Sequence, residues 1–167
     1  MDILIERASP ANASGVLDFL RVAGSETDNL TFGPEGLPFT VESEAAYIHQ
    51  SQESRDNIML LAKANGQVIG SASLNRLSRR MQHRGELSIA ILKAYWNKGI
   101  GGKMITEILN FAKENSFEII ELQVRSDNLA AIHLYEKFGF RKTGSHPSFF
   151  KIDGAYIPFD YMILNVQ

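Results

Sequence analysis

Apolar residues along this chain recur with two periods, about two residues in some segments and about 3.6 in others. Segments in which apolar residues alternate or run continuously predict β-strands, and segments in which they recur three and four positions apart predict amphipathic helices. The predicted strands cover Asp2–Arg7, Asn57–Ala64, Gln67–Leu77, Arg84–Leu92, Ile119–Val124 and a hairpin over Phe149–Leu164. The predicted helices cover Asn12–Ala23, Val41–Ser51, Gly101–Asn115 and a segment that follows Asn128 and ends at Gly139.

Short turn motifs connect these elements and help to define the fold class. Asn65-Gly66 is the strongest hairpin signal in the chain, and Asp153-Gly154 predicts a second hairpin near the C-terminus. The resulting order is β-α-α-β-β-β-α-β-α-β-β, which predicts an α/β (α+β) fold with a mixed central sheet and helices on both faces. We expect one domain that covers residues 1–167.

Composition narrows the classes of function. The chain has 167 residues, of which 44% are hydrophobic, and this is enough for one domain with a substantial core. Seventeen basic and nineteen acidic side chains give a net charge of −2, so no basic field indicates nucleic acid or an anionic membrane as a partner. The first residues lack the basic flank and small-residue cleavage site of a signal peptide, and we expect a cytoplasmic protein.

Cysteine and histidine usage excludes several chemistries. The chain has no cysteine, so disulfides, thiolate zinc sites and an acyl-cysteine intermediate are excluded. The histidines at positions 49, 83, 133 and 146 show no metal-ligand spacing with one another or with acids, and we predict no metal site.

A glycine-rich stretch follows the strand predicted over Arg84–Leu92. Glycines at a strand-to-helix junction let backbone N–H groups and the positive end of a helix approach phosphate oxygens. A P-loop is excluded because Met104 follows Gly102-Lys103, and a Rossmann fingerprint that begins at Gly99 would need its third glycine at Met104. A phosphate cradle and a glycine-rich helix start packed against a strand both remain open on these residues alone.

Two motifs resemble the GNAT superfamily of acyl-coenzyme-A-dependent N-acyltransferases. The stretch from Trp96 to Gly101 resembles the signature Arg/Gln-x-x-Gly-x-Gly/Ala, with Trp96 where the family prefers Arg or Gln. The stretch Asn128–Phe140 is similar to the pattern Asn-x-x-Ala-x-x-x-Tyr-x-x-x-Gly-Phe. The resemblance covers the chain from about Glu86 onward, and the predicted order of elements is the one expected of a GNAT domain.

The resemblance implies an N-acetyltransferase that uses acetyl-CoA as acyl donor and a primary amine, on a small molecule or a protein, as acceptor. Direct attack in a ternary complex is the expected mechanism, because no cysteine can carry the acyl group. A non-catalytic coenzyme-A-binding sensor or interaction module on the same fold is the alternative. A homodimer is compatible with either function. The implied cofactor-binding residues are Ile89, Ala90, Ile91, Leu92, Asn97, Lys98, Gly99, Ile100, Gly101, Gly102, Lys103, Asn128, Ala131 and Tyr135.

Tyr135 and Glu86 are the catalytic candidates. By resemblance, Tyr135 is the general acid, and a phenol with a pKa of about 10 suits this role because it stays neutral while it protonates the leaving thiolate. The alternative is a core tyrosine on the apolar face of its helix. Glu86 would accept the proton of the incoming ammonium, whose pKa is about 10.4, and the alternative is a solvated carboxylate paired with Arg84. Asn128 is expected to cap its helix and also to bind the pantetheine arm.

Three further expectations concern the surroundings of this site. A bulge near Ile89–Leu92 would separate the cofactor strand from its neighbour, and a side chain at Gly101 would block the phosphates. The basic group Arg76, Arg79, Arg80, His83 and Arg84 either binds coenzyme A phosphates or forms a solvated turn. The acceptor pocket, or else an ordinary solvated loop, would involve Glu26, Asp28, Phe32, Glu35, Phe39, Phe149, Tyr156 and Tyr161.

Overall fold

Seven strands form one mixed sheet in the computed structural model, which describes all 167 residues. The strands lie in the order β1-β2-β3-β4-β5-β7-β6, and β4 with β5 is the parallel pair among antiparallel neighbours. The strands are β1 (Ile3–Arg7), β2 (Asn57–Ala64), β3 (Gln67–Arg76), β4 (Arg84–Ile91), β5 (Ile119–Arg125), β6 (Arg141–Ile152) and β7 (Ala155–Asn165).

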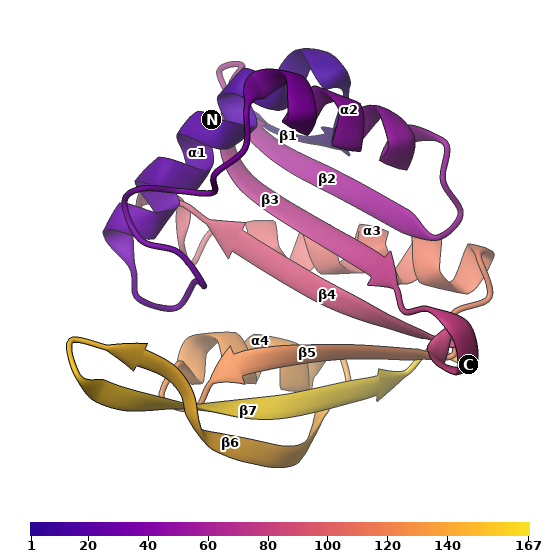
Figure 1. The fold of residues 1–167 in the computed structure, drawn as a ribbon. Coiled ribbons are helices and arrows are strands. Elements are labelled where there is room, and N and C mark those ends of the chain that lie inside the picture. The colour runs from indigo at the N-terminus through magenta and orange to yellow at the C-terminus, as the bar shows by residue number, and fades with distance from the viewer.

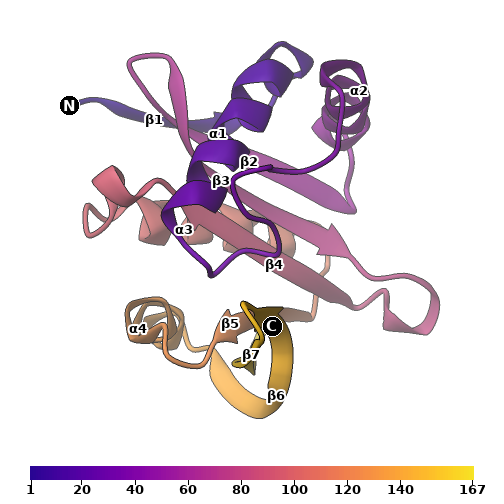
Figure 2. The same cartoon turned by 60° about the vertical axis from the view of Figure 1, so that its left-hand side comes forward.

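Helices cover both faces of this sheet (Figures 1 and 2). Helices α1 (Ala13–Glu26) and α2 (Val41–Gln52) lie on one face, whereas α3 (Ile100–Glu114) and α4 (Leu129–Lys137) lie on the other. Short 3-10 turns complete the chain at Pro10–Asn12, Arg79–Met81 and Lys93–Tyr95. The predicted element order, the mixed sheet and the helices on both faces are confirmed.

The alternation of side chains in β2 divides the interior into two cores. Met59 and Leu61 are buried against α1 and α2, whereas Ile58 and Leu60 belong to the larger core that α3 covers. Successive side chains of a strand point to opposite faces, so a strand buried on both faces has an almost continuous apolar sequence. This strand therefore fixes the position of both helical layers.

The hairpin turns form as predicted, but the last hairpin is longer than its sequence indicates. Asn65-Gly66 and Asp153-Gly154 all have positive φ, between 49° and 81°, as tight two-residue turns of this kind require. Strand β6 begins at Arg141 and not at Phe149, so the predicted start is wrong. Its first half, Arg141–Ser148, is largely exposed at the sheet edge, and an exposed edge strand needs no buried alternating face.

Strands β4 and β5 pair at one end and then diverge (Figure 1). On the other side, β4 pairs with β3 in unbroken register from Gly85 to Ile91, so the predicted bulge near Ile89–Leu92 is absent from that ladder. The separation comes instead from the angle between β4 and β5. The paired positions of these two strands are Arg84 with Ile119, Gly85 with Ile120 and Glu86 with Glu121.

Candidate active site

The divergence after Glu86 leaves one side of β4 without a neighbouring strand. The N–H of Leu92 donates to the carbonyl of Ile69 on β3, at 2.9 Å. Because backbone groups of an antiparallel pair alternate between inward and outward directions, those of Ile89 and Ile91 face away from β3 and toward β5. Over this stretch β4 can pair with an extended ligand in place of a strand.

The first turn of α3 presents a second set of free backbone donors next to this gap. Gly99 is the N-cap with φ of 75°, and its carbonyl accepts the first helical hydrogen bond, from Lys103 N–H at 3.2 Å. The N–H groups of Ile100, Gly101 and Gly102 precede this bond and have no partner. In a helix of 15 residues, this turn has the polarity and the donors of an anion site.

Gly101 has a different structural role from the one its motif indicates. A Cβ on Gly101 would lie 3.0 Å from Leu134 Cδ2, so the missing side chain allows α3 to pack against α4. Bulk at Gly101 would therefore also press on Leu134, in addition to its predicted effect on the phosphates. Gly99 is the glycine next to open space, because a Cβ at this position would have no other atom within 4 Å.

Trp96 connects the glycine-rich loop to β4. Its indole Nε1–H donates to the carbonyl of Ile91 at 2.7 Å, and Lys93 Nζ lies 6.0 Å from the ring centroid. This hydrogen bond uses the last outward-facing carbonyl of β4 and leaves the Ile91 N–H and the Ile89 peptide groups for a ligand. The indole of Trp96, a neutral donor, thus attaches the loop to β4. The GNAT signature has Arg or Gln at this position.

Tyr135 projects from α4 to the divergence of β4 and β5. The residue is 7% exposed, and its ring packs against Phe140 with centroids 5.8 Å apart. Burial raises the pKa of Tyr135 to about 12, because the phenolate would lose its hydration. Asn128 caps the helix, with its Oδ1 accepting from Ala131 N–H at 3.3 Å, as the sequence predicts.

Glu86 lies where β4 and β5 begin to diverge. Its expected alternative partner, Arg84, is instead bound to Glu121 by two hydrogen bonds, of 2.8 and 2.9 Å. Asn75 is the residue paired with Glu86 across β3 and β4, and Asn75 Oδ1 accepts from the hydroxyl of Tyr47 at 3.2 Å. The Glu86 carboxylate has no ion pair.

A cavity of about 670 Å³ joins these two residues, because Glu86 and Tyr135 both line it. Ile89 and Ala90 also line it, although successive residues of β4 point to opposite faces of the sheet. The cavity therefore reaches both faces of the sheet through the divergence. A ligand that enters from the α1 and α2 side can therefore contact, within this cavity, a second ligand that lies along β4 and α3.

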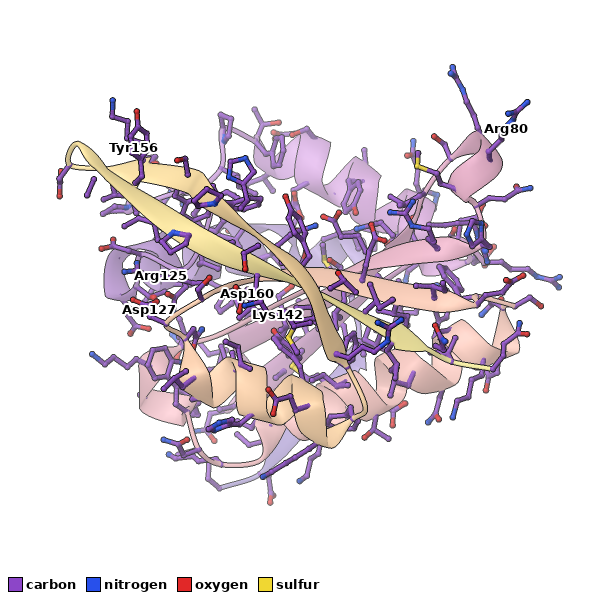
Figure 3. The ribbon with its side chains drawn as sticks, turned by 90° about the horizontal axis from the view of Figure 1, so that it is seen from below. Arg80, Arg125, Asp127, Lys142, Tyr156 and Asp160 are labelled. Carbon is purple, nitrogen blue, oxygen red and sulfur yellow. The ribbon has the colours of Figure 1, made fainter.

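The predicted acceptor residues divide between this cavity and other places. Phe32, Phe39 and Phe149 line it, whereas the other five of that group do not. The Glu26 carboxylate accepts from Lys93 N–H at 2.7 Å, and Tyr156 lies on the exposed β6–β7 hairpin (Figure 3). The sequence therefore predicted three aromatic residues that line the cavity, but the three acids predicted with them lie elsewhere.

Most of the polar residues that line the cavity were not predicted from the sequence. Glu44 is the main omission, because an acid in the first turn of a helix is usually explained by the helix dipole and not by a site. The spacing of Glu44, Tyr47 and Ile48 on one side of α2 is the signal that could have found it. The other missed polar residues are Asn29, Thr31, Ser43, Tyr47, Ser71, Ser73, Ser88 and Gln123.

Asp160 fixes the turn between β5 and α4. Its carboxylate accepts from the hydroxyls of Ser126 at 2.7 Å and Ser145 at 2.8 Å, and Lys142 Nζ lies 3.4 Å away (Figure 3). Desolvation opposes ionisation of Asp160, but these hydrogen bonds and the Lys142 charge outweigh it and lower its pKa. The network holds the chain just before Asn128, and so the start of the helix that carries Tyr135.

The basic group between β3 and β4 lies at the opposite end of β4 from the first turn of α3. Arg79 and Arg80 are exposed, and Arg80 extends away from the molecule (Figure 3). The guanidinium of Arg76 lies 3.8 Å from the Phe117 ring centroid and pairs with Asp56. Of the two interpretations, the solvated turn is the one that agrees with this position.

The structure contains no group of three or more acidic or histidine side chains arranged to hold a metal ion. None of its helices has the length and apolar character needed to cross a bilayer.

Comparison with known proteins places this geometry in a family context. The model of the "Acetyltransferase (GNAT) family" matches residues 26–140. The chain is 32% identical over 111 residues to N-alpha-acetyltransferase RimI of Mycobacterium tuberculosis, which covers 66% of this chain and 68% of that protein. A GNAT acetyltransferase from Streptococcus pneumoniae superposes with a TM-score of 0.94 at 31% identity, over 98% of this chain and 99% of the other. The structure of yncA from Salmonella typhimurium, solved with its cofactor acetyl-CoA, superposes with a TM-score of 0.85 at 21% identity. The match covers 99% of this chain and 94% of the other.

Proposed function

The chain belongs to the GNAT family and is an acetyl-CoA-dependent acyltransferase, and from that premise we propose that it acetylates a primary amine by direct attack in a ternary complex. The observation that carries this proposal is that Glu86 and Tyr135 line one cavity at the divergence of β4 and β5. The two groups come from different sides of the sheet. A reaction with two separate proton transfers needs a proton acceptor and a proton donor, and these two residues can supply them.

Acetyl-CoA would lie along β4 and α3. The outward N–H groups of Ile89 and Ile91 suit the amides of the pantetheine arm, and one of them would polarise the thioester carbonyl. The free N–H groups of Ile100, Gly101 and Gly102 suit the pyrophosphate. Asn128 uses its Oδ1 to cap α4, which leaves its NH₂ group for a pantetheine carbonyl.

In the proposed reaction, the acceptor nitrogen attacks the thioester carbonyl carbon. A nitrogen–carbon bond forms, the carbon–sulfur bond breaks, and the products are an amide and coenzyme A. Glu86 accepts the proton that the amine loses, and Tyr135 donates a proton to the departing sulfur. With a pKa of about 12, the Tyr135 phenol is neutral at ordinary pH and can act as this donor.

Release of free thiol from acetyl-CoA, measured against a panel of primary amines, tests this proposal. We expect release with at least one amine, together with a mass increase of one acetyl group on that amine. Cofactor binding by calorimetry without thiol release for any amine would instead support a non-catalytic coenzyme-A-binding module. The assay also reports slow hydrolysis, so a reaction without amine is the background.

A further inference from the structure

The charge of the acceptor cavity gives information about its substrate beyond the reacting amine. The charged side chains among its lining residues are Glu44 and Glu86, and both are acidic. Most of the remaining lining is apolar, and it includes the rings of Phe39, Phe149 and Phe150. A cavity of this composition favours a cation with an apolar body, and it opposes a carboxylate.

Glu44 is unusual because it is buried without a partner. The residue is 5% exposed, and its side chain takes part in no ion pair or hydrogen bond with the rest of the chain. Desolvation raises the pKa of Glu44, and no cationic side chain of the protein pairs with its carboxylate. The chain does not fully enclose its oxygens, so a cation that enters the cavity can pair with this carboxylate.

Two attachments of α2 fix the position of Glu44 beside the cavity. Thr40 and Ser43 form a reciprocal capping box at the start of α2, with both hydrogen bonds at 3.0 Å. One turn later, the Tyr47 hydroxyl donates to Asn75, which anchors the helix to β3. Glu44 lies between these two attachments, so the backbone that carries its side chain is held in place before any ligand arrives.

Glu44 and Glu86 stand on different walls of the cavity. Glu44 is on α2, whereas Glu86 is on the sheet beneath, paired with Asn75 on the neighbouring strand. An acceptor with one amino group at Glu86 would leave the Glu44 carboxylate buried and unpaired. A second positive group on the same molecule would neutralise it.

We propose that the acceptor carries a second cationic group, separate from the reacting amine, and that Glu44 binds this group across an apolar body. The inference rests on the proposed function, because it assigns the substrate class of the same site. Glu44 is then a specificity residue: it selects diamines and comparable dications over monoamines, and it disfavours amines that carry a carboxylate.

Three amines with the same ring test this inference: 1,3-bis(aminomethyl)benzene, benzylamine and 3-(aminomethyl)benzoate. All three carry one aminomethyl group. At the meta position of the ring they carry, in that order, a second aminomethyl group, a hydrogen and a carboxylate. Since hydrogen bonds to charged groups contribute about 1.5–3 kcal/mol, we expect kcat/KM for the diamine to exceed that for benzylamine by about ten- to hundredfold. This is well above the twofold factor from its two equivalent amines. The aminobenzoate should be the poorest acceptor.

Two variants assign the preference to its residue. Glu44→Gln should reduce the ratio of kcat/KM for the diamine to that for benzylamine to about the statistical factor. Glu42→Gln is the matched control, because it removes an exposed carboxylate from the same helical turn and should keep the full preference. Glu44→Gln should unfold at the same or a higher temperature, since it removes an uncompensated buried charge.

Calorimetry with coenzyme A bound separates the inference from the proposed function. Glu44-dependent binding of the diamine without turnover would support the dication site while the acetyl-transfer proposal fails. Acetylation of benzylamine as fast as the diamine, or a diamine preference that survives in Glu44→Gln, would overturn the dication site while acetyl transfer stands. The wild-type series alone gives this answer if a variant fails to fold.

Discussion

The two sides of the divergence between β4 and β5 differ in the chemical groups that face a ligand. On the cofactor side, the ligand-facing groups are backbone N–H groups of β4 and of the first turn of α3. On the acceptor side, they are side chains from α2, the loop before it, the sheet and the last hairpin. Backbone groups recognise a constant ligand through chain geometry, whereas side chains can change between relatives without changing the fold. The cofactor side is therefore general, and the acceptor side is specific.

Tyr135 stands between the two sides, and its removal has the largest expected effect. Tyr135→Phe keeps the packing on Phe140 but removes the proton donor, so kcat should fall by roughly 10²- to 10⁴-fold with little change in cofactor affinity. Steady-state kinetics and calorimetry measure the two quantities. Tyr156→Phe, on the exposed hairpin, is the control for loss of a hydroxyl. Unchanged turnover would return Tyr135 to the role of a core residue.

The pH dependence of the wild-type rate gives a further test of the same residue. Because burial raises the pKa of Tyr135 to about 12, its phenol stays protonated through pH 10, where an ordinary tyrosine would be about half ionised. The rate should therefore show no alkaline decline from this group up to about pH 10. A decline centred near pH 10 that disappears in Tyr135→Phe would contradict the buried-donor assignment.

Glu86 tests the acceptor side through its proton chemistry. Glu86→Gln should lower the rate by roughly ten- to hundredfold at pH 7. The deficit should shrink as the pH approaches the amine pKa of about 10.4, because solution then supplies the neutral amine. Glu121→Gln is not a suitable control, since it would release Arg84; the exposed Glu42→Gln serves better. Parallel pH profiles for wild type and Glu86→Gln would exclude Glu86 as the base.

The cofactor side can be tested with two glycines of nearly identical conformation. Gly99 and Gly66 have φ of 75° and 79°, and both face open space. Gly99→Asp would place a carboxylate on the free N–H groups of α3 and should weaken acetyl-CoA binding by on the order of tenfold or more. Gly66→Asp carries the same backbone strain and charge in the β2–β3 hairpin, outside the first turn of α3, and should bind acetyl-CoA normally. Equal affinities of the two variants would move the phosphate site away from α3.

Trp96 should give the smallest effect. Trp96→Phe removes the hydrogen bond to the Ile91 carbonyl, and a net loss of about 0.5–1.5 kcal/mol corresponds to a roughly two- to tenfold weaker affinity for acetyl-CoA. Calorimetry measures this change directly. Trp96 is the only tryptophan of the chain, so in wild type its fluorescence also reports cofactor binding. Wild-type affinity in the variant would mean that the loop holds its position without the indole.

The sequence was sufficient for the fold and for the local turns and caps near the proposed cofactor side. Asn65-Gly66, the glycines after Trp96 and the Asn128 cap act on their own neighbours, so local rules identify them. The same rules misplaced the start of β6, because an exposed edge strand carries no buried periodicity. They also could not show that Gly101 packs against Leu134, because that residue lies on a different helix.

The state of the charged groups on the proposed acceptor side was decided by the tertiary structure. Glu44 has the appearance of an ordinary first-turn acid until α2 packs over the sheet and buries it. Likewise, Glu86 is free only because Arg84 reaches Glu121 on a strand 37 positions away in sequence. Whether a charge is solvated, paired or held ready for a ligand depends on burial and on distant neighbours, and neither is encoded locally. The sequence by itself therefore determined the family to which this protein belongs, and only the folded chain decided which charges are left unpaired in its cavity.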